Sequence, residues 1–193
     1  MLTLYTNQRS RGRIAQWMVE ETGAECEMVE LDYGAPMRTP EFLALNPMGK
    51  VPVLTEGDTV VTEVAAICAW LAERFPEADL APRPDARAEY YRWMFFAAGP
   101  LEAAVTARAL GIEPPPERRQ MVGYGDFDSV IGALEQKLGR DDFIAGGRFT
   151  AADVYVGSHI AWGLQFGSVP ARPAFEAYRD RLAARPAFGR AIG

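Results

Sequence analysis

The stretch Arg9-Ser10-Arg11-Gly12-Arg13 has the residue types needed to hold an anion. It follows a strand-like segment and opens a helical pattern, so free backbone amides and the positive end of the helix dipole would add to the field of three arginines. The Ser10 hydroxyl could donate a hydrogen bond to that anion. A solvated basic helix tip is the alternative, and the stretch taken alone is more typical of it.

A second candidate is the segment 46–54, with the sequence NPMGKVPVL. Pro52 falls just inside a short apolar strand pattern, where it cannot donate to a sheet, so it should lie at an edge or follow a cis peptide bond. A cis Val51-Pro52 bond would turn the backbone amide and carbonyl of Val51 outward, where an extended ligand could pair with them. A proline that merely ends a loop is an equal alternative.

Glu63, His159 and two cysteines are the other residues that could do chemistry. An acid at a helix start, such as Glu63, usually complements the helix dipole, and a ligand ammonium would give it a second role. His159 falls within an apolar helical run and is interpreted as a packed core residue. Cys26 and Cys68 are far apart and form no C-x-x-C motif, which argues against a disulfide framework or a thiolate zinc site. Both thiols are interpreted as buried and inert.

Thr150 and Asp153 have capping-box spacing directly before a long apolar run. The Thr150 hydroxyl would accept from the Asp153 amide, and the Asp153 carboxylate would reach back to the Thr150 amide. The pair is therefore predicted to start a buried helix rather than to catalyse. Replacing Asp153 by alanine is expected to cost about 1 kcal/mol.

Strand and helix signals alternate in residues 1–76, which we interpret as an α/β domain. Strands are predicted at 2–5, 27–31, 51–54 and 59–61, and helices around 14–22, from 40 onward and around 63–75. The order βαβ followed by αββα predicts a parallel pair and a later antiparallel hairpin. The sheet should therefore be mixed and four-stranded.

Prolines in residues 77–84 mark a predicted linker, because they cannot continue a helix. Residues 85–193 contain no convincing strand pairs and are predicted to form an all-helical domain. A kink is expected at Gly99-Pro100. The helical stretches are predicted at 85–110, 117–138, 150–164 and 174–184.

The overall composition limits the classes of function. The 193 residues carry a net charge of -6, with a pI near 4.9, which argues against binding to nucleic acid or to an anionic membrane. No apolar run approaches the roughly 18 residues of a membrane span, and the first residues form a strand rather than a basic leader. A single histidine excludes most His-based triads and metal centres, so no metal is predicted. The expected location is the cytoplasm.

Three segments together resemble the cytosolic glutathione S-transferases, in particular bacterial, serine-type members. They are 48–54 (MGKVPVL), 62–71 (TEVAAICAWL) and 149–153 (FTAAD), and the resemblance covers nearly the whole chain. It implies a thioredoxin-like N-terminal domain that binds glutathione as co-substrate. It also implies an all-helical C-terminal domain that helps to bind a small hydrophobic electrophile, and a homodimer.

Carried over residue by residue, the resemblance gives each candidate segment a role. Ser10 matches the catalytic hydroxyl of the serine-type members, and Tyr5 or a backbone amide is the alternative group that would stabilise the thiolate. Val51, before a cis Pro52, would face the cysteinyl backbone of glutathione. Lys50 would approach the glycine carboxylate.

At the γ-glutamyl end, the resemblance assigns binding to Glu63 and Val64. Such families usually have Ser or Asp where this chain has Val64, so only the Val64 backbone amide could hold the γ-glutamyl carboxylate. Gln8 stands where a proline is common. The loop before the first helix contains no cysteine, which disfavours the thiol-transferring members of the family.

The implied activity is transfer of glutathione, as its thiolate, to an electrophile. A hydroxyl hydrogen bond, helix amides and nearby arginines each favour thiolate over thiol. A pKa lowered by about two units corresponds to roughly 3 kcal/mol, which such groups can supply. The alternatives are a non-catalytic relative that binds a ligand or a protein, which Val64 favours, and a glutathione-dependent isomerase, peroxidase or dehalogenase.

Overall fold

The computed structural model describes residues 1–192, and its internal contacts divide the chain into two units. The first unit consists of Met1–Ala81 with the segment from Arg185 onward, and the second of Pro82–Ala184. All four strands of the described residues belong to the first unit. The division at residues 81 and 82 falls inside the linker predicted at 77–84.

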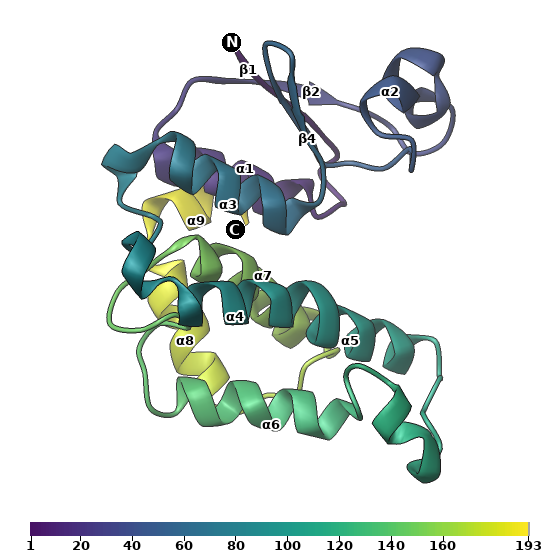
Figure 1. Cartoon of the computed structure of the whole chain (residues 1–193), viewed down its shortest axis with the longest axis vertical. Helices are drawn as coiled ribbons and strands as arrows, with labels where there is room; N and C mark the ends of the chain where they lie inside the picture. Colours follow the sequence, from purple (N-terminus) through teal and green to yellow (C-terminus); the bar gives the residue numbers. More distant parts are fainter. Residues whose placement is uncertain (193) are drawn as a thin grey trace. The chain divides into compact units, whose positions relative to one another are not determined.

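A four-stranded mixed sheet organises the first unit (Figure 1). The strand order is β2-β1-β3-β4, in which only the β1–β2 pair is parallel. The predicted mixed sheet is therefore confirmed. β3 begins one residue after Pro52, because proline has no amide hydrogen for the ladder. The strands are β1 (Leu2–Thr6), β2 (Cys26–Glu30), β3 (Val53–Glu56) and β4 (Thr59–Val61).

Helices cover both faces of this sheet. Tyr5 and Val53 are paired in the ladder and pack with Met37 and Phe42, on the face of α2. Side chains alternate along a strand, so the neighbouring Leu4–Leu54 pair points to the other face, where α1 and α3 lie side by side (Figure 1). The helices of the first unit are α1 (Gly12–Thr22), α2 (Pro40–Leu45), α3 (Val64–Arg74) and α9 (Pro186–Ala191).

Helix α9 corrects the predicted second domain, residues 85–193, because α9 packs on α1 of the first unit. The Phe188 ring meets Trp17 edge-on, with centroids 4.9 Å apart, and Trp17 is fully buried. Arg185 forms a bidentate ion pair with Glu21. The Arg13 side chain donates to a carbonyl of α9. A six-residue helix is too short to give a clear apolar period, so the sequence pattern did not predict it.

The second unit is helical, and α7 is its most buried helix. The predicted kink at Gly99-Pro100 is a π-helical turn over Ala97–Leu101, which joins α4 to α5. None of the helices in residues 1–192 is long and apolar enough to cross a membrane. The helices of this unit are α4 (Ala88–Phe96), α5 (Glu102–Ala109), α6 (Phe127–Leu138), α7 (Ala151–Phe166) and α8 (Pro173–Ala183).

The helix predicted at 117–138 is shorter in the structure. Pro116–Met121 forms only a 3-10 turn, and α6 begins at Phe127. Gly125 has a left-handed φ of 68°, which interrupts the helix, and the Asp126 side chain then caps α6 by accepting from an amide of its first turn.

The start of α7 has the predicted capping box. The Asp153 carboxylate also binds groups outside the helix, because one of its oxygens accepts from Tyr178 Oη (2.8 Å) and Ile144 N (2.7 Å). The other oxygen accepts from the amide and hydroxyl of Thr150. Burial raises the pKa of Asp153, although all four donors act in the opposite direction. Asp153 thus links α7, α8 and the preceding loop.

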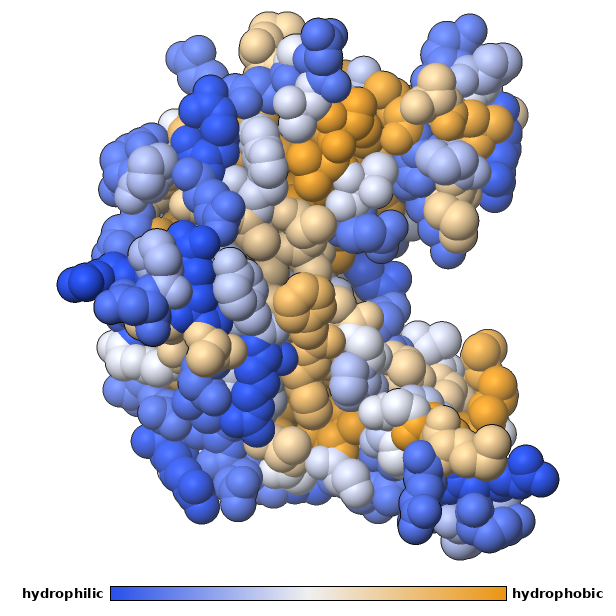
Figure 2. All heavy atoms as spheres, in the orientation of Figure 1, coloured by the Kyte–Doolittle hydropathy of each residue, from blue (hydrophilic) through white to orange (hydrophobic). Residues whose placement is uncertain are grey.

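Apolar side chains also reach the surface of each unit. In Figure 2, apolar atoms of the first unit appear where β4 lies in Figure 1, and Val60 of that strand is 42% exposed. In the second unit, the chain beyond α5 exposes Leu110, Ile112 and Met121. On α4, Tyr91 and Phe95 are exposed one helical turn apart.

Candidate functional site

Strand register brings three sequence-predicted segments to one end of the sheet. Tyr5, next to the end of β1, pairs with Val53 at the start of β3. Leu54 in turn pairs with Val61 at the end of β4. Because these pairs are antiparallel, the chain after β1, before β3 and after β4 lies at the same end. We call these three segments, residues 7–11, 50–52 and 62–64, the site edge.

Ser10 lies in a tight turn between β1 and α1. Its amide and its hydroxyl both donate to the Asn7 carbonyl, at 3.0 Å and 2.7 Å. Its Oγ also accepts from the Gly12 amide at 2.9 Å and so satisfies one of the first amides of α1. The hydroxyl therefore stands at the helix start, as predicted, with its hydrogen directed to the protein backbone.

The three arginines around Ser10 differ in their surroundings. Arg9 and Arg11 are exposed, while Arg13 is half-buried and donates to the Ala191 carbonyl at 2.7 Å. The Tyr33 hydroxyl donates to the Arg9 carbonyl, and the Arg9 guanidinium lies 5.8 Å from the centre of that ring. Two arginines therefore remain at the surface of the site edge, and the third helps to join α1 to α9.

Asn46 organises the loop that leads to Pro52, a role that the sequence analysis missed. Its side chain is buried, donates to the Lys50 carbonyl at 2.8 Å and accepts from the Met48 amide at 3.0 Å. Its carbonyl accepts from the Gly49 amide. The Asn-Pro pair was a usable signal, because asparagine before proline favours turns of this kind.

Gly49 and Pro52 shape the same loop. Gly49 has a φ of 60°, and a β-carbon there would lie 2.7 Å from the Met37 carbonyl oxygen, so no other residue fits without a shift. The Val51-Pro52 bond is cis, as the first of the two alternatives expected, and the pairing of Val51 with a ligand stays a prediction. Val51 lies outside β3, Pro52 is buried and Lys50 is exposed.

Glu63 begins α3 with an unusual backbone conformation. Its φ is 62° and its ψ is 113°, a region that non-glycine residues rarely adopt and that is enriched at functional sites. Its carbonyl accepts from Ile67 of the helix. The Val64 side chain is buried, so only the Val64 amide, the first of an 11-residue helix, can serve a ligand.

Other candidate residues are packed into the fold. The Tyr5 ring lies 5.9 Å from Phe42, in the cluster on the α2 face rather than in the loop after β1. The His159 side chain is 10% exposed and meets the Tyr155 ring edge-on. Burial raises the pKa of the Cys26 thiol to about 11, and burial raises that of Cys68 further. Both thiols are therefore poor nucleophiles at neutral pH.

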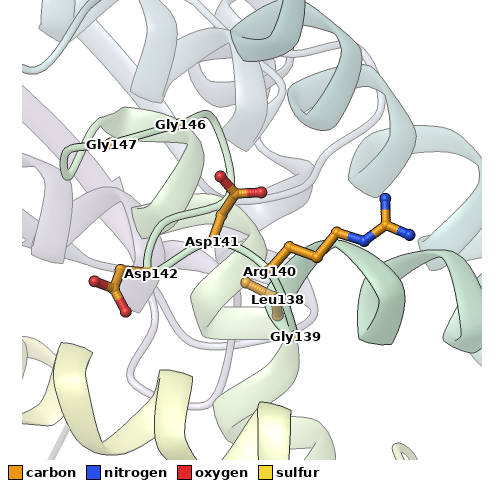
Figure 3. A pocket seen from close by; sticks show the side chains of 7 residues that line it. All are labelled: Leu138, Gly139, Arg140, Asp141, Asp142, Gly146 and Gly147. Atoms are coloured by element: carbon orange, nitrogen blue, oxygen red, sulfur yellow. The ribbon is translucent and has the colours of Figure 1, made fainter.

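A polar hollow in the second unit is formed by Leu138–Asp142 and by Gly146 and Gly147 (Figure 3). Its two carboxylates have cationic partners, since Asp141 lies 3.0 Å from Lys137 Nζ and Asp142 lies 2.7 Å from Arg181. Arg140 points away from the other labelled side chains. Within residues 1–192, no three His, Cys, Asp or Glu side chains converge as metal ligands. The site edge therefore remains the stronger candidate.

A mixed four-stranded sheet with this site edge, followed by an all-helical unit, defines a class of two-part proteins with a thioredoxin-like first domain. Residues 1–73 match the family model described as the glutathione S-transferase N-terminal domain, and residues 106–186 match the corresponding C-terminal domain. The chain belongs to the glutathione S-transferase family. The predicted fold class and family are thereby confirmed.

Individual relatives agree with this assignment over nearly the full length. The chain is 30% identical to "Glutathione S-transferase 3" from Zea mays, over 91% of this chain and 85% of that protein. A solved glutathione S-transferase from Xylella fastidiosa is 25% identical, with a TM-score of 0.81 and coverage of 100% and 97%. A theta class enzyme from Xanthomonas axonopodis pv. citri, solved with glutathione bound, is 27% identical, with a TM-score of 0.78 and coverage of 99% and 96%.

Proposed function

We propose that this protein is a glutathione transferase that binds glutathione at the site edge and transfers its thiolate to a small apolar electrophile. The observation that carries the proposal is the convergence of residues 7–11, 50–52 and 62–64 at one end of the sheet. These segments together offer a hydroxyl, exposed cations, a strand-like backbone and the first amide of α3. A tripeptide with a thiol, two carboxylates and an ammonium needs each of these groups.

The backbone and charges of the site edge can be matched to the parts of glutathione. The amide and carbonyl of Val51 would pair with the cysteinyl backbone, as a β-strand would. Lys50 is exposed and would meet the glycine carboxylate. Glu63 would hold the γ-glutamyl ammonium, while the Val64 amide at the start of α3 would donate to the neighbouring carboxylate.

Ser10 would stabilise the thiolate by changing the acceptor of its hydroxyl hydrogen. The hydrogen now goes to the Asn7 carbonyl, which would keep the bond from the Ser10 amide after the hydroxyl turned to the sulfur. The exchange thus leaves no backbone group without a partner. The thiol proton passes to solvent, the thiolate forms the sulfur–carbon bond, and the leaving group departs with its electron pair.

The second substrate is proposed to be small and apolar, because the second unit presents aromatic surface. Tyr91 and Phe95 of α4 have ring centroids 6.5 Å apart, and Phe95 is 73% exposed. Such rings suit the binding of an uncharged electrophile. We further propose that the protein acts as a homodimer in the cytoplasm, as the resemblance to the family implies.

The test is a titration of bound glutathione, followed by the ultraviolet absorbance of its thiolate. The bound thiol pKa should lie about two units below that of free glutathione in the wild type, and Ser10→Ala should raise it by about one unit or more. Thr3→Ala, on the same strand, is the matched control and should leave this pKa unchanged. The mechanism is wrong if wild type and Ser10→Ala both show the pKa of free glutathione.

A second candidate function is non-catalytic binding of a ligand or a protein. Two observations favour it, namely the buried Val64 side chain and the Ser10 hydrogen held by Asn7. Retention on immobilised glutathione, followed by turnover of an aromatic halide, separates the candidates. Retention without turnover of the halide, of a peroxide or of an isomerisation substrate would favour the binding protein. Turnover of only a peroxide or an isomerisation substrate would change the assigned reaction.

A further inference from the structure

The Thr6 hydroxyl is a buried polar group that the proposed mechanism has not used. Thr6 is the last residue of β1 and is 1% exposed. Its backbone carbonyl accepts from the Leu31 amide, but its Oγ1 has no hydrogen-bond partner among residues 1–192. A buried hydroxyl without a partner lowers stability relative to an apolar side chain of the same shape, so its presence calls for another reason.

Thr6 Oγ1 and Ser10 Oγ lie around the same point at the start of α1. A β-carbon added at Gly12 would lie 2.0 Å from Thr6 Oγ1 and 2.9 Å from Ser10 Oγ. The two hydroxyls are therefore near neighbours, and only a glycine at position 12 leaves room for both. Among the residues described, Thr6 Oγ1 is the only buried hydroxyl of the first unit without a hydrogen-bond partner.

The hydrogen bonds of Ser10 leave space for one more donor. A hydroxyl oxygen carries one hydrogen and two lone pairs. Within residues 1–192, the Ser10 hydrogen goes to the Asn7 carbonyl and one lone pair accepts from the Gly12 amide. The second lone pair can accept from Thr6 once Ser10 turns toward a ligand.

We propose that Thr6 is a positioning residue for the thiolate, acting through Ser10. This inference rests on the proposed function of Ser10. When the Ser10 hydrogen moves from Asn7 to the glutathione sulfur, the Thr6 hydroxyl donates to Ser10 Oγ. Ser10 then accepts two hydrogen bonds and donates one. Acceptance of a second bond polarises the hydroxyl, so the bond that it donates to the sulfur is stronger.

If Thr6 has this role, loss of its hydroxyl should not lower the stability of the protein but should weaken the stabilisation of the thiolate. Thr6→Val removes the hydroxyl at nearly constant shape, so the protein without glutathione should be as stable as the wild type or more stable. The pKa of the bound thiol should rise by about half a unit, equivalent to about threefold less thiolate at a pH below that pKa. A residue that matters only for packing would instead lower stability without moving the thiol pKa.

The experiment is a double-mutant cycle with the absorbance titration of bound glutathione. Thr6→Val should raise the thiol pKa in the wild-type background and leave it unchanged in the Ser10→Ala background, because its effect passes through Ser10. Thr6→Ser, which keeps the hydroxyl, should retain the wild-type pKa. Thr3→Val, on the opposite face of β1, is the control for replacing a threonine by valine and should leave the thiol pKa unchanged. If the valine variant does not fold, Thr6→Ala replaces it, with the same expected rise in the thiol pKa.

Each result decides between the proposals. An unchanged thiol pKa in Thr6→Val, or an equal rise in both backgrounds, overturns the role of Thr6. If Ser10→Ala raises the pKa while Thr6→Val does not, the proposed function stands and only this inference fails. If Ser10→Ala itself leaves the pKa unchanged, the Ser10 mechanism fails and the role of Thr6 falls with it.

Discussion

The starts of α7 and α1 differ in how fully their polar groups are hydrogen-bonded. Both place a hydroxyl residue just before a helix whose first amides need partners. At α7, Thr150 and Asp153 are buried, and four donors converge on one carboxylate. At α1, the capping hydroxyl of Ser10 is only half-buried, and the nearby Thr6 hydroxyl has no partner among residues 1–192.

This difference in hydrogen bonding indicates that one helix start serves stability and the other serves ligand binding. A helix start whose polar groups all bond to each other is rigid and has nothing left for a ligand. A helix start with incomplete bonding is less stable but can complete its bonds with a substrate. The start of α3 belongs with α1, since Glu63 provides no side-chain cap and has a strained backbone.

Asp153→Ala should show the largest effect on stability. Four donors would lose their acceptor, including the buried Tyr178 hydroxyl and the Ile144 amide. The structure therefore revises the expected loss from about 1 kcal/mol for a simple cap to about 3–5 kcal/mol. Urea denaturation measures it, and Asp142→Ala, on the surface nearby, is the control. A loss near 1 kcal/mol would mean that the four bonds do not act as one network.

Ser10→Ala should lower the stability much less, by about 1 kcal/mol or below, because only the Gly12 amide is left without a partner. The Asn7 carbonyl loses the hydroxyl but keeps its bond from the amide of residue 10. The same denaturation measurement applies, in the absence of glutathione. Thr150→Ala is the comparison at α7, where the hydroxyl is buried, and its loss should be the larger of the two. Equal losses would remove the distinction between the two helix starts.

Glu63→Gly should have the smallest effect on stability, with the opposite sign. Glycine adopts a φ of 62° without strain, but it also raises the conformational entropy of the unfolded chain. The net gain in the free energy of unfolding should be about 0.5–1 kcal/mol. Glu63→Ala keeps the strain and loses the carboxylate, so it should not gain stability. Both variants should bind glutathione more weakly by calorimetry. A glycine variant less stable than the alanine variant would contradict the strain at this position.

Patterns along the chain predicted the sheet and most helices, because these elements depend on local signals. Thr39 and Pro40 predicted the start of α2, and Gly23 predicted the end of α1, where its φ is 69°. The short α9 and the late start of α6 were not predicted. The first depends on contact with Trp17, far away in the sequence, and the second on the backbone of Gly125.

The candidate site was predicted as separate segments rather than as an arrangement. Residue types identified Ser10 and Glu63, and the family resemblance added Lys50. The strand order explains why their segments meet. The sequence did not reveal that Asn46 holds the Lys50 carbonyl, or that the Ser10 hydrogen bonds to Asn7. Such bonds depend on side-chain geometry that only the folded loops create. The roles of these residues toward glutathione remain predictions.

The packing of α9 on α1 has a consequence for how the protein is made. Glu21 and Arg185 are 164 residues apart, so a ribosome must synthesise the whole second unit before the partner of α1 emerges. Until then, the apolar surface of Trp17 lacks the Phe188 ring that covers it. The unit that is translated first is therefore completed last, and a nascent chain that stalls in the second unit would display this surface to chaperones.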